Sequence, residues 1–189
     1  VVHTLRSNTL QTALSEMLSG VNNTVEITYY TPFVTYRGVT EFISYLPETL
    51  EESDVEVTVY TKRLDRVRDD EEMLSPEDVA DFDERFGAFR LRARAPGDQG
   101  NQLSDGRELR SGMAHLKAIT LTEQTQTSRP PLGTILTSAN LSKRAWSRTS
   151  EGFEIGVALS GTKDSEGLAE FFTKSLPQCY VEPTTSVLA

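Results

Sequence analysis

The chain has 189 residues, of which 37% are hydrophobic and 25% are charged, and its net charge is −9. This is the balance of a globular protein rather than of a disordered chain, and the length suits one domain, which we expect to span residues 1–189. No stretch reaches the roughly 18 consecutive apolar residues of a membrane-spanning helix, so we expect a cytoplasmic protein without a membrane anchor. A single cysteine, Cys179, excludes an internal disulfide, and with only two histidines we expect neither a metal nor another cofactor.

Charge is distributed unevenly along the chain. Residues 41–84 hold 16 acidic and four basic side chains, whereas residues 85–148 hold 11 basic and four acidic ones, a local charge of +7. A basic segment inside an acidic chain indicates a polyanionic ligand near that segment. The chain also has many Asp and Glu but only five lysines, a composition typical of salt-adapted proteins.

Hydrophobic periodicity predicts alternating helices and strands. In the first half, the expected elements are a helix over 9–18, a strand over 25–31, a loop between Pro32 and Gly38, a helix over 39–50 and a strand over 55–60. The second half adds a charged loop over 62–72, a helix over 75–86, a strand over 88–94, a loop over 96–110, strands over 115–122, 133–137 and 153–159, a helical turn over 141–146 and a helix over 165–176. This alternation predicts an α/β fold in which helices flank both faces of a mixed β-sheet.

Three short motifs in the second half carry side chains suited to phosphate chemistry. His115 and Lys117 are two residues apart, so in the predicted strand they project from one face, and Ser138 and Asn140 have the same spacing. Glu154 follows in the third motif. Phosphoryl transfer needs donors for the phosphate oxygens and a reacting group in line with the leaving oxygen, and these residue types can supply both.

In this order and context the motifs resemble those of the phospholipase D superfamily, over roughly residues 20–175. The resemblance implies a phospholipase D-like fold and a metal-independent phosphodiesterase in which His115 attacks phosphorus and forms a phosphohistidine. Lys117 and Asn140 would hold the non-bridging oxygens, Ser138 would support the phosphate pocket, and Glu154 would orient the His115 ring.

Two features depart from the family pattern. The Asp expected seven residues after His115 is Thr122, an absence shared by the tyrosyl-DNA phosphodiesterase branch. The family's sites use two H-x-K motifs and this chain has one, so we expect a homodimer whose site is shared across a two-fold axis.

Other interpretations of these residues remain open at the sequence level. His115 could be a core histidine, Asn140 could cap a turn that begins at Leu141, and Trp146 and Tyr36 could stack on a base or pack in the interior. Arg110, Lys143 and Arg144 are candidate contacts for backbone phosphates. The arginines at 90, 92 and 94 form either a solvated strand face or a ligand surface.

The leading functional hypothesis is therefore a nuclease that cleaves DNA or RNA, because phosphate neutralisation supplies most nucleic-acid affinity. A non-catalytic phospholipase D-like module that binds nucleic acid or a partner within a larger assembly is the alternative. A phospholipid hydrolase or transferase ranks lower, since no basic, aromatic-rich amphipathic helix is evident.

Overall fold

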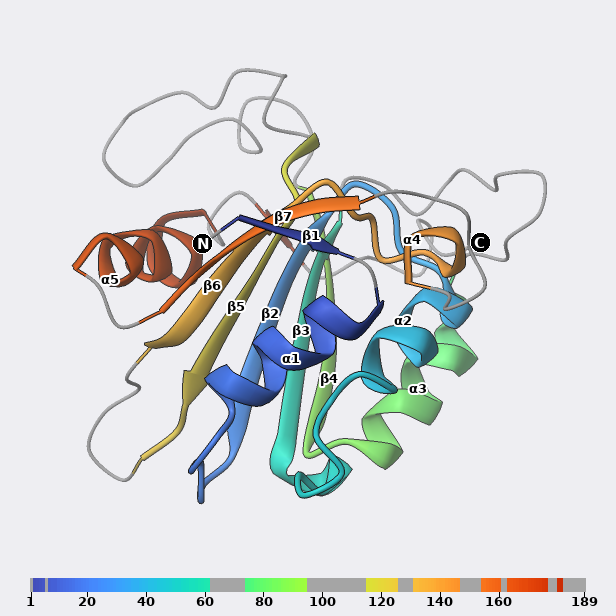
Figure 1. Cartoon of the computed structure of the whole chain (residues 1–189). Coiled ribbons are helices and arrows are strands. Elements are labelled where there is room, and N and C mark those ends of the chain that lie inside the picture. The colour runs from blue at the N-terminus through green and yellow to red at the C-terminus, as the bar shows by residue number, and fades with distance from the viewer. Residues whose placement is uncertain are drawn as a thin grey trace.

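The computed structural model describes residues 2–5, 7–61, 74–94, 115–125, 131–146, 154–160, 163–176 and 180–181. Its strands form one sheet in the order β1-β7-β6-β5-β2-β3-β4-β8 (Figure 1). Their bounds are β1 Val2–Leu5, β2 Val25–Thr31, β3 Val55–Thr61, β4 Ala88–Arg94, β5 Ala118–Glu123, β6 Pro131–Thr137, β7 Glu154–Leu159 and β8 Tyr180–Val181. The central strands β2, β3 and β4 are parallel and every other pairing is antiparallel, so the sheet is mixed.

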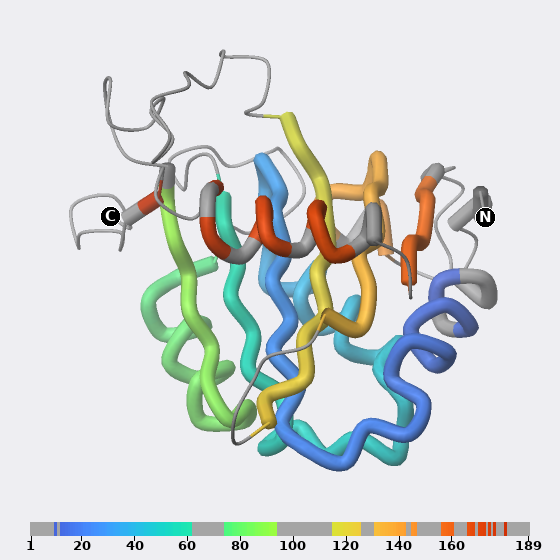
Figure 2. The backbone as a smooth tube through the Cα atoms, turned by 90° about the vertical axis from the view of Figure 1, so that its left-hand side faces the viewer, coloured from blue at the N-terminus to red at the C-terminus, as the bar shows by residue number. Residues whose placement is uncertain are grey.

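Helices cover both faces of this sheet. On one face lie α1 (Ser7–Met17), α2 (Tyr36–Ile43) and α3 (Pro76–Arg85), and on the other lies α5 (Lys163–Glu170), which continues as a π-helix over Phe171–Ser175 (Figure 2). Two short pieces, η1 (Glu52–Asp54) and α4 (Lys143–Trp146), complete the described helices. The predicted α/β fold with a mixed sheet and helices on both faces is confirmed. Within the described ranges, no helix has the length and apolar character needed to cross a bilayer.

Alternation along the strands creates two apolar layers. In β2, Ile27 and Tyr29 face the helices α1 to α3 and join the larger cluster, whereas Tyr30 faces α5 and joins the smaller one with Phe172 and Leu176. Successive strand residues point to opposite faces, so one strand can serve both layers. The second layer is small because the rest of that sheet face carries threonines and charged residues.

Local signals place several elements where the sequence predicts them. The strand over 88–94 forms over those residues. Helix α3 begins with Pro76, and its N-cap Ser75 makes a capping box in which the Ser75 hydroxyl accepts from the Asp78 N–H and the Asp78 carboxylate accepts from the Ser75 N–H. These bonds satisfy backbone donors that the first helical turn otherwise leaves unpaired.

The predicted helix over 39–50 is wrong at both ends. The helix begins at Tyr36, because the side chain of Thr35 caps it by accepting from the Gly38 N–H at 3.0 Å, so Gly38 lies inside the helix rather than at the end of a loop. It ends at Ile43, four residues before Pro47, whose ring and missing N–H cannot be accommodated in a helix interior.

The strand predicted over 115–122 starts three residues later, at Ala118, because its partner β2 ends at this level: Ala118 pairs with Tyr30. The short outer strands β1 and β8 were not predicted, since segments of four and two residues carry too little periodicity to read. The charged loop predicted over 62–72 and the loop predicted over 96–110 lie outside the described residues.

Candidate active site

Three segments that carry the predicted motifs leave neighbouring strands at one end of the sheet. Residues 115–117 precede β5, residues 138–140 follow β6, and Glu154 is the first residue of β7. In the antiparallel register, Ala118 lies opposite Leu136 and Thr137 lies opposite Gly156. The start of β5, the end of β6 and the start of β7 therefore form a continuous edge, which is also the edge where the parallel strands β2, β3 and β4 end (Figure 1).

The first motif lies in the approach to β5. His115 is exposed and Lys117 is half-buried, and the Lys117 ammonium donates to the His115 carbonyl oxygen at 3.0 Å. Because the strand begins only at Ala118, the expectation that strand alternation aligns these two side chains is wrong. The ammonium-to-carbonyl bond and the start of the strand hold the segment instead. The exposure of His115 also contradicts its interpretation as a core histidine.

The second motif forms a turn after β6. Ser138 is exposed and Asn140 is half-buried, and the Oδ1 atom of Asn140 is buried and accepts no hydrogen bond from the described residues. The interpretation of Asn140 as a helix cap is wrong, because the N–H groups of Ala145 and Trp146 bond to the Ser142 carbonyl and α4 begins at Lys143. The side-chain amide of asparagine also carries two N–H donors, which suit anionic oxygens.

Strand β2 and the segment that follows it hold this turn in place through hydrogen bonds. The Tyr29 hydroxyl donates to the Ala139 carbonyl at 3.0 Å, the Thr31 hydroxyl accepts from the Leu141 N–H at 3.1 Å, and the Thr35 N–H donates to the Leu141 carbonyl at 2.9 Å. The backbone on both sides of Asn140 is thereby fixed to one strand end. Sequence reasoning missed Tyr29, Thr31 and Thr35, because these bonds span more than 100 residues and leave no local pattern.

Gly38 allows helix α2 to approach the same turn. A Cβ atom at this position would lie 2.2 Å from the carbonyl oxygen of Leu141 and 2.5 Å from the Cα of Ser142. Both are backbone atoms, so any residue larger than glycine requires the turn to move. The turn is also bonded to the first motif, because the Thr137 N–H donates to the Lys117 carbonyl at 3.1 Å.

Thr122, which stands where the family has an Asp, lies far from this edge. Thr122 lies in β5, where it pairs with Glu26 of the neighbouring strand β2. It follows Lys117 by five residues, and at a rise of about 3.3 Å per residue it is about 16 Å from the site end of the sheet. Its side chain is on the face that α5 partly covers and is only 5% exposed. The replacement of the motif Asp therefore alters the sheet interior and removes no group from the candidate site.

The remaining candidates divide between described and undescribed parts of the chain. Arg110 lies outside the described residues, and so do the side chains of Lys143, Arg144 and Glu154. The backbone places Lys143 and Arg144 in α4, shortly after the second motif. Trp146 is 3% exposed and packs against Tyr29, Phe42 and Tyr45, so its packing interpretation is confirmed. Tyr36 stacks on Phe82 with ring centroids 5.1 Å apart.

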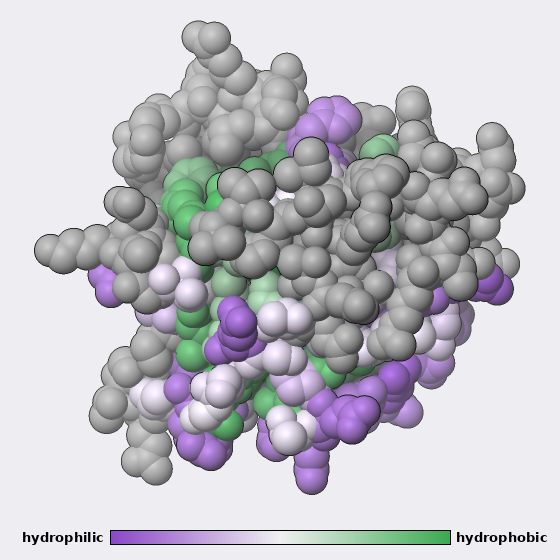
Figure 3. All heavy atoms as spheres, viewed as in Figure 1, coloured by the Kyte–Doolittle hydropathy of each residue, from purple (hydrophilic) through white to green (hydrophobic). Residues whose placement is uncertain are grey.

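Charged residues of both signs lie away from the strand ends. Exposed acids gather along α3, where Figure 3 shows a hydrophilic surface at the lower right, and they include Glu77, Asp81, Asp83 and Glu84. On the other face of the sheet, the exposed Arg90 pairs with Glu56 at 3.2 Å, which favours a solvated strand face at this position. Helix α3, which flanks the sheet away from the strand ends, thus accounts for part of the acidic excess of residues 41–84.

Comparisons with known proteins concern the fold. No protein-family model matches the sequence, and no curated protein matches it. Among solved structures, NucT from Helicobacter pylori, a member of the phospholipase D superfamily, is similar over 97% of this chain and 98% of its own, at 13% identity and a TM-score of 0.54. A mutant of yeast tyrosyl-DNA phosphodiesterase is similar over 83% of this chain and 44% of its own, at 13% identity and a TM-score of 0.46.

Proposed function

Because the chain has a phospholipase D-like fold, we propose that it is a phosphodiesterase that cleaves DNA or RNA without a metal ion, through a phosphohistidine at His115. The observation that carries the proposal is the convergence of three motif segments at one end of the sheet. A histidine, a lysine and an asparagine from neighbouring strand ends match the groups that a phosphoryl-transfer site requires.

In the first step, a ring nitrogen of His115 attacks phosphorus, a P–N bond forms, and the P–O bond to the leaving group breaks. The leaving oxygen takes a proton from a second imidazole. In the second step, that imidazole accepts a proton from water, the water oxygen attacks phosphorus, and the P–N bond breaks to release His115. Glu154 accepts a hydrogen bond from the other ring nitrogen of His115 and fixes its tautomer.

Lys117 and Asn140 bind the non-bridging oxygens, on which negative charge is concentrated in the transition state. Lys117 can do so without losing its bond to the His115 carbonyl, because an ammonium group has three N–H donors. Ser138, exposed in the same turn, supports the phosphate pocket.

The second imidazole comes from His115 of a second copy of the chain. The sequence has only one H-x-K motif, and His3, its other histidine, lies in the outer strand β1, three strands away from β5. A two-fold axis through the site end of the sheet would bring two equivalent His115 rings to one phosphate. The proposed enzyme is therefore a homodimer.

Nucleic acid is the preferred substrate because of charge. Residues 85–148 carry a net +7 although the whole chain carries −9. Within this segment Arg110, Lys143 and Arg144 are proposed to neutralise phosphates on either side of the scissile bond. NucT, whose fold the chain shares, is a nuclease. The alternative of a non-catalytic module rests mainly on Thr122, and its distance from the site weakens that argument.

The test is cleavage of labelled DNA and RNA in EDTA by wild type, His115→Ala and His3→Ala. We expect cleavage by wild type and His3→Ala, and a loss of at least about 10³-fold for His115→Ala, because the residue supplies the nucleophile. A labelled phosphate on His115 after acid-free denaturation would identify the intermediate. No cleavage by wild type, or equal cleavage by His115→Ala, rejects the proposal.

Sharing of the site is tested by mixing. Equal amounts of wild type and His115→Ala are mixed and allowed to exchange subunits. If each site needs His115 from both copies, only about one quarter of the dimers are active, so the mixture has about one quarter of the activity of the same total amount of wild type. If each chain acts alone, the mixture has about one half of that activity. Activity that follows the wild-type fraction linearly would refute the shared site while leaving the phosphodiesterase in place.

A further inference from the structure

Leu116, the middle residue of the first motif, packs into the smaller of the two apolar layers, the one next to α5. Its side chain is half-buried, and it contacts the cluster whose buried members are Tyr30, Ala118, Phe172 and Leu176. His115 before it is exposed, and Lys117 after it is half-buried. The apolar attachment of the motif to the interior therefore passes through Leu116, between the two residues that are proposed to act on the phosphate.

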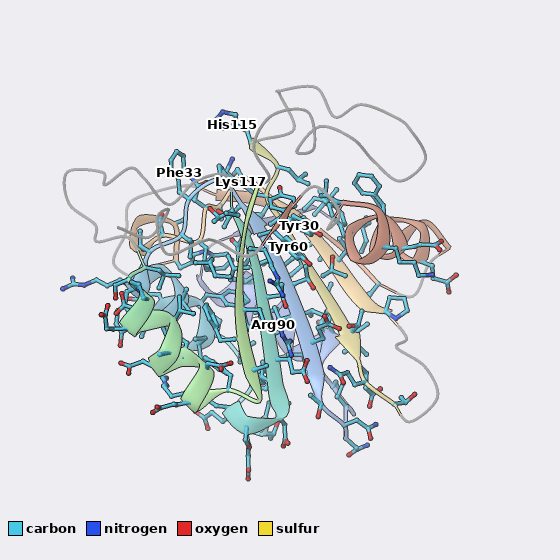
Figure 4. The ribbon with its side chains drawn as sticks, turned by 180° about the vertical axis from the view of Figure 1, so that it is seen from behind. Tyr30, Phe33, Tyr60, Arg90, His115 and Lys117 are labelled. Atoms are coloured by element: carbon cyan, nitrogen blue, oxygen red, sulfur yellow. The ribbon has the colours of Figure 1, made fainter. Side chains whose placement is uncertain are left out.

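This apolar layer is tied to both the sheet and the C-terminal helix. The Tyr30 hydroxyl donates a hydrogen bond to the carbonyl of Phe172, which lies in the π-helix that continues α5. The rings of Tyr30 and Phe172 also lie 5.3 Å apart, and the ring of Tyr30 stacks on that of Tyr60 at 4.6 Å. Figure 4 shows Tyr30 and Tyr60 close to the end of the sheet from which Lys117 and His115 extend. The motif therefore packs against side chains that are held by several contacts of their own.

The hydrogen bonds described for the motif do not replace that packing. The Lys117 carbonyl accepts from the Thr137 N–H at 3.1 Å, and the Lys117 ammonium donates to the His115 carbonyl at 3.0 Å. The second bond comes from a flexible four-carbon side chain, which can follow His115 when the backbone moves. Among the contacts of the described residues, the packing of Leu116 is the one that fixes the backbone next to His115 to the interior.

The same layer is also connected to the second motif. Tyr30 is followed in β2 by Thr31, whose hydroxyl accepts from the Leu141 N–H in the turn that carries Asn140. Consecutive residues of one strand thus contact the layer that holds Leu116 and the turn that holds Asn140. The separation of the two motifs therefore depends on Leu116 staying in the layer.

We propose that Leu116 is a positioning residue of the candidate active site, because its packing fixes where His115 lies relative to Asn140. The inference rests on the proposed function and adds to it the residue that orients the backbone of the nucleophile. Leu116 touches neither the substrate nor the reacting atoms and acts through its neighbours. A displacement of a reacting group by about 1 Å lowers a rate by about 10²-fold, so losing the packing should slow the chemical step. Substrate binding should change little, because phosphates along the whole strand supply most nucleic-acid affinity.

The experiment compares Leu116→Ala with Leu168→Ala, a substitution in α5. Both leucines are half-buried and contact the same cluster, so both variants should lose a similar amount of stability in thermal unfolding. On labelled DNA in EDTA, Leu116→Ala should lower kcat about 10²-fold and change KM by less than about threefold, whereas Leu168→Ala should keep the wild-type kcat. Leu116→Met should recover most of the kcat, because methionine fills a similar volume.

A second measurement does not require cleavage. The heteronuclear Overhauser effect of the His115 amide, measured by NMR, reports how rigidly this backbone is held, and it should fall in Leu116→Ala but not in Leu168→Ala. If Leu116→Ala does not fold, Leu116→Val and Leu168→Val are compared in the same two assays. Equal kcat for the variants at the two positions, or an unchanged Overhauser effect in the Leu116 variant, overturns the inference and leaves the proposed function intact wherever cleavage still depends on His115. If wild type cleaves nothing, the proposed function is rejected, and the Overhauser effect alone decides whether Leu116 holds His115.

Discussion

Replacing Gly38 by alanine tests whether α2 and the Asn140 turn are in direct contact. The added Cβ would lie 2.2 Å from the Leu141 carbonyl oxygen and 2.4 Å from its carbon. Ordinary contact begins at 3.4 Å, so the turn must retreat by about 1.2 Å. Overpacking of this kind costs about 1–3 kcal/mol, and weakening the two hydrogen bonds of Leu141 adds about 1 kcal/mol each. The better helix propensity of alanine offsets at most about 1 kcal/mol.

We therefore expect Gly38→Ala to destabilise the protein by about 2–5 kcal/mol, which lowers Tm by about 2–4 °C for each kcal/mol. Cleavage should fall by about 10²-fold, because displacing a catalytic group by about 1 Å has an effect of that size. Gly167→Ala is the control: it also lies within a helix, its Cβ would meet nothing within 4 Å, and it should stabilise by about 0.5–1 kcal/mol. Equal stabilisation by both substitutions, with wild-type cleavage, would refute the contact.

Three further predictions concern residues outside the site. Ser75→Ala removes one half of the capping box of α3 and should lower the free energy of unfolding by about 1 kcal/mol, with cleavage unchanged. The measurement is urea titration, and an unaltered midpoint would contradict a stabilising role of the Ser75 cap. Thr122→Asp introduces the Asp of the phospholipase D motif, but it places a carboxylate on the buried sheet face beside Glu26, so we expect lower Tm and no gain in cleavage. Burial raises the pKa of Tyr60, so the folded state binds this proton more tightly, and stability should fall as pH rises above about 10, the value in the unfolded chain. Tyr60→Phe should flatten that part of the stability profile, and an unchanged slope would show that Tyr60 is not its source.

The elements that sequence reasoning located best are those whose signals are local. The alternation in residues 88–94 and the Ser75–Pro76 start of α3 are complete within a few positions, and both elements form as predicted. The start of α2 was missed because Gly38 looks like a loop residue when its neighbour Leu141 is unknown. The glycine at position 38 is explained by its close contact with Leu141, which lies about 100 positions away along the chain.

The candidate site shows the same division. The motif residues 115, 117, 138, 140 and 154 could be selected from their types and order, and topology brings their segments to one end of the sheet. Their local geometry could not be predicted, because Lys117 bonds to a backbone carbonyl rather than projecting from a strand beside His115. The supporting bonds from Tyr29 and Thr31 depend on which strand lies next to which, and only the sheet order reveals this.

The margins of the described sheet bear on how two copies can associate. One outermost strand, β1, has four residues, whereas on the other margin β8 pairs only with Ala93 and Arg94, so residues 88–92 of β4 have no partner strand on that side among the described residues. An open strand edge can pair with another chain, but pairing along β4 would join the two copies by their margins. The proposed shared site instead requires contact through side chains around the strand ends, so the dissociation constant of that dimer should respond to salt and to surface substitutions there rather than to changes along β4.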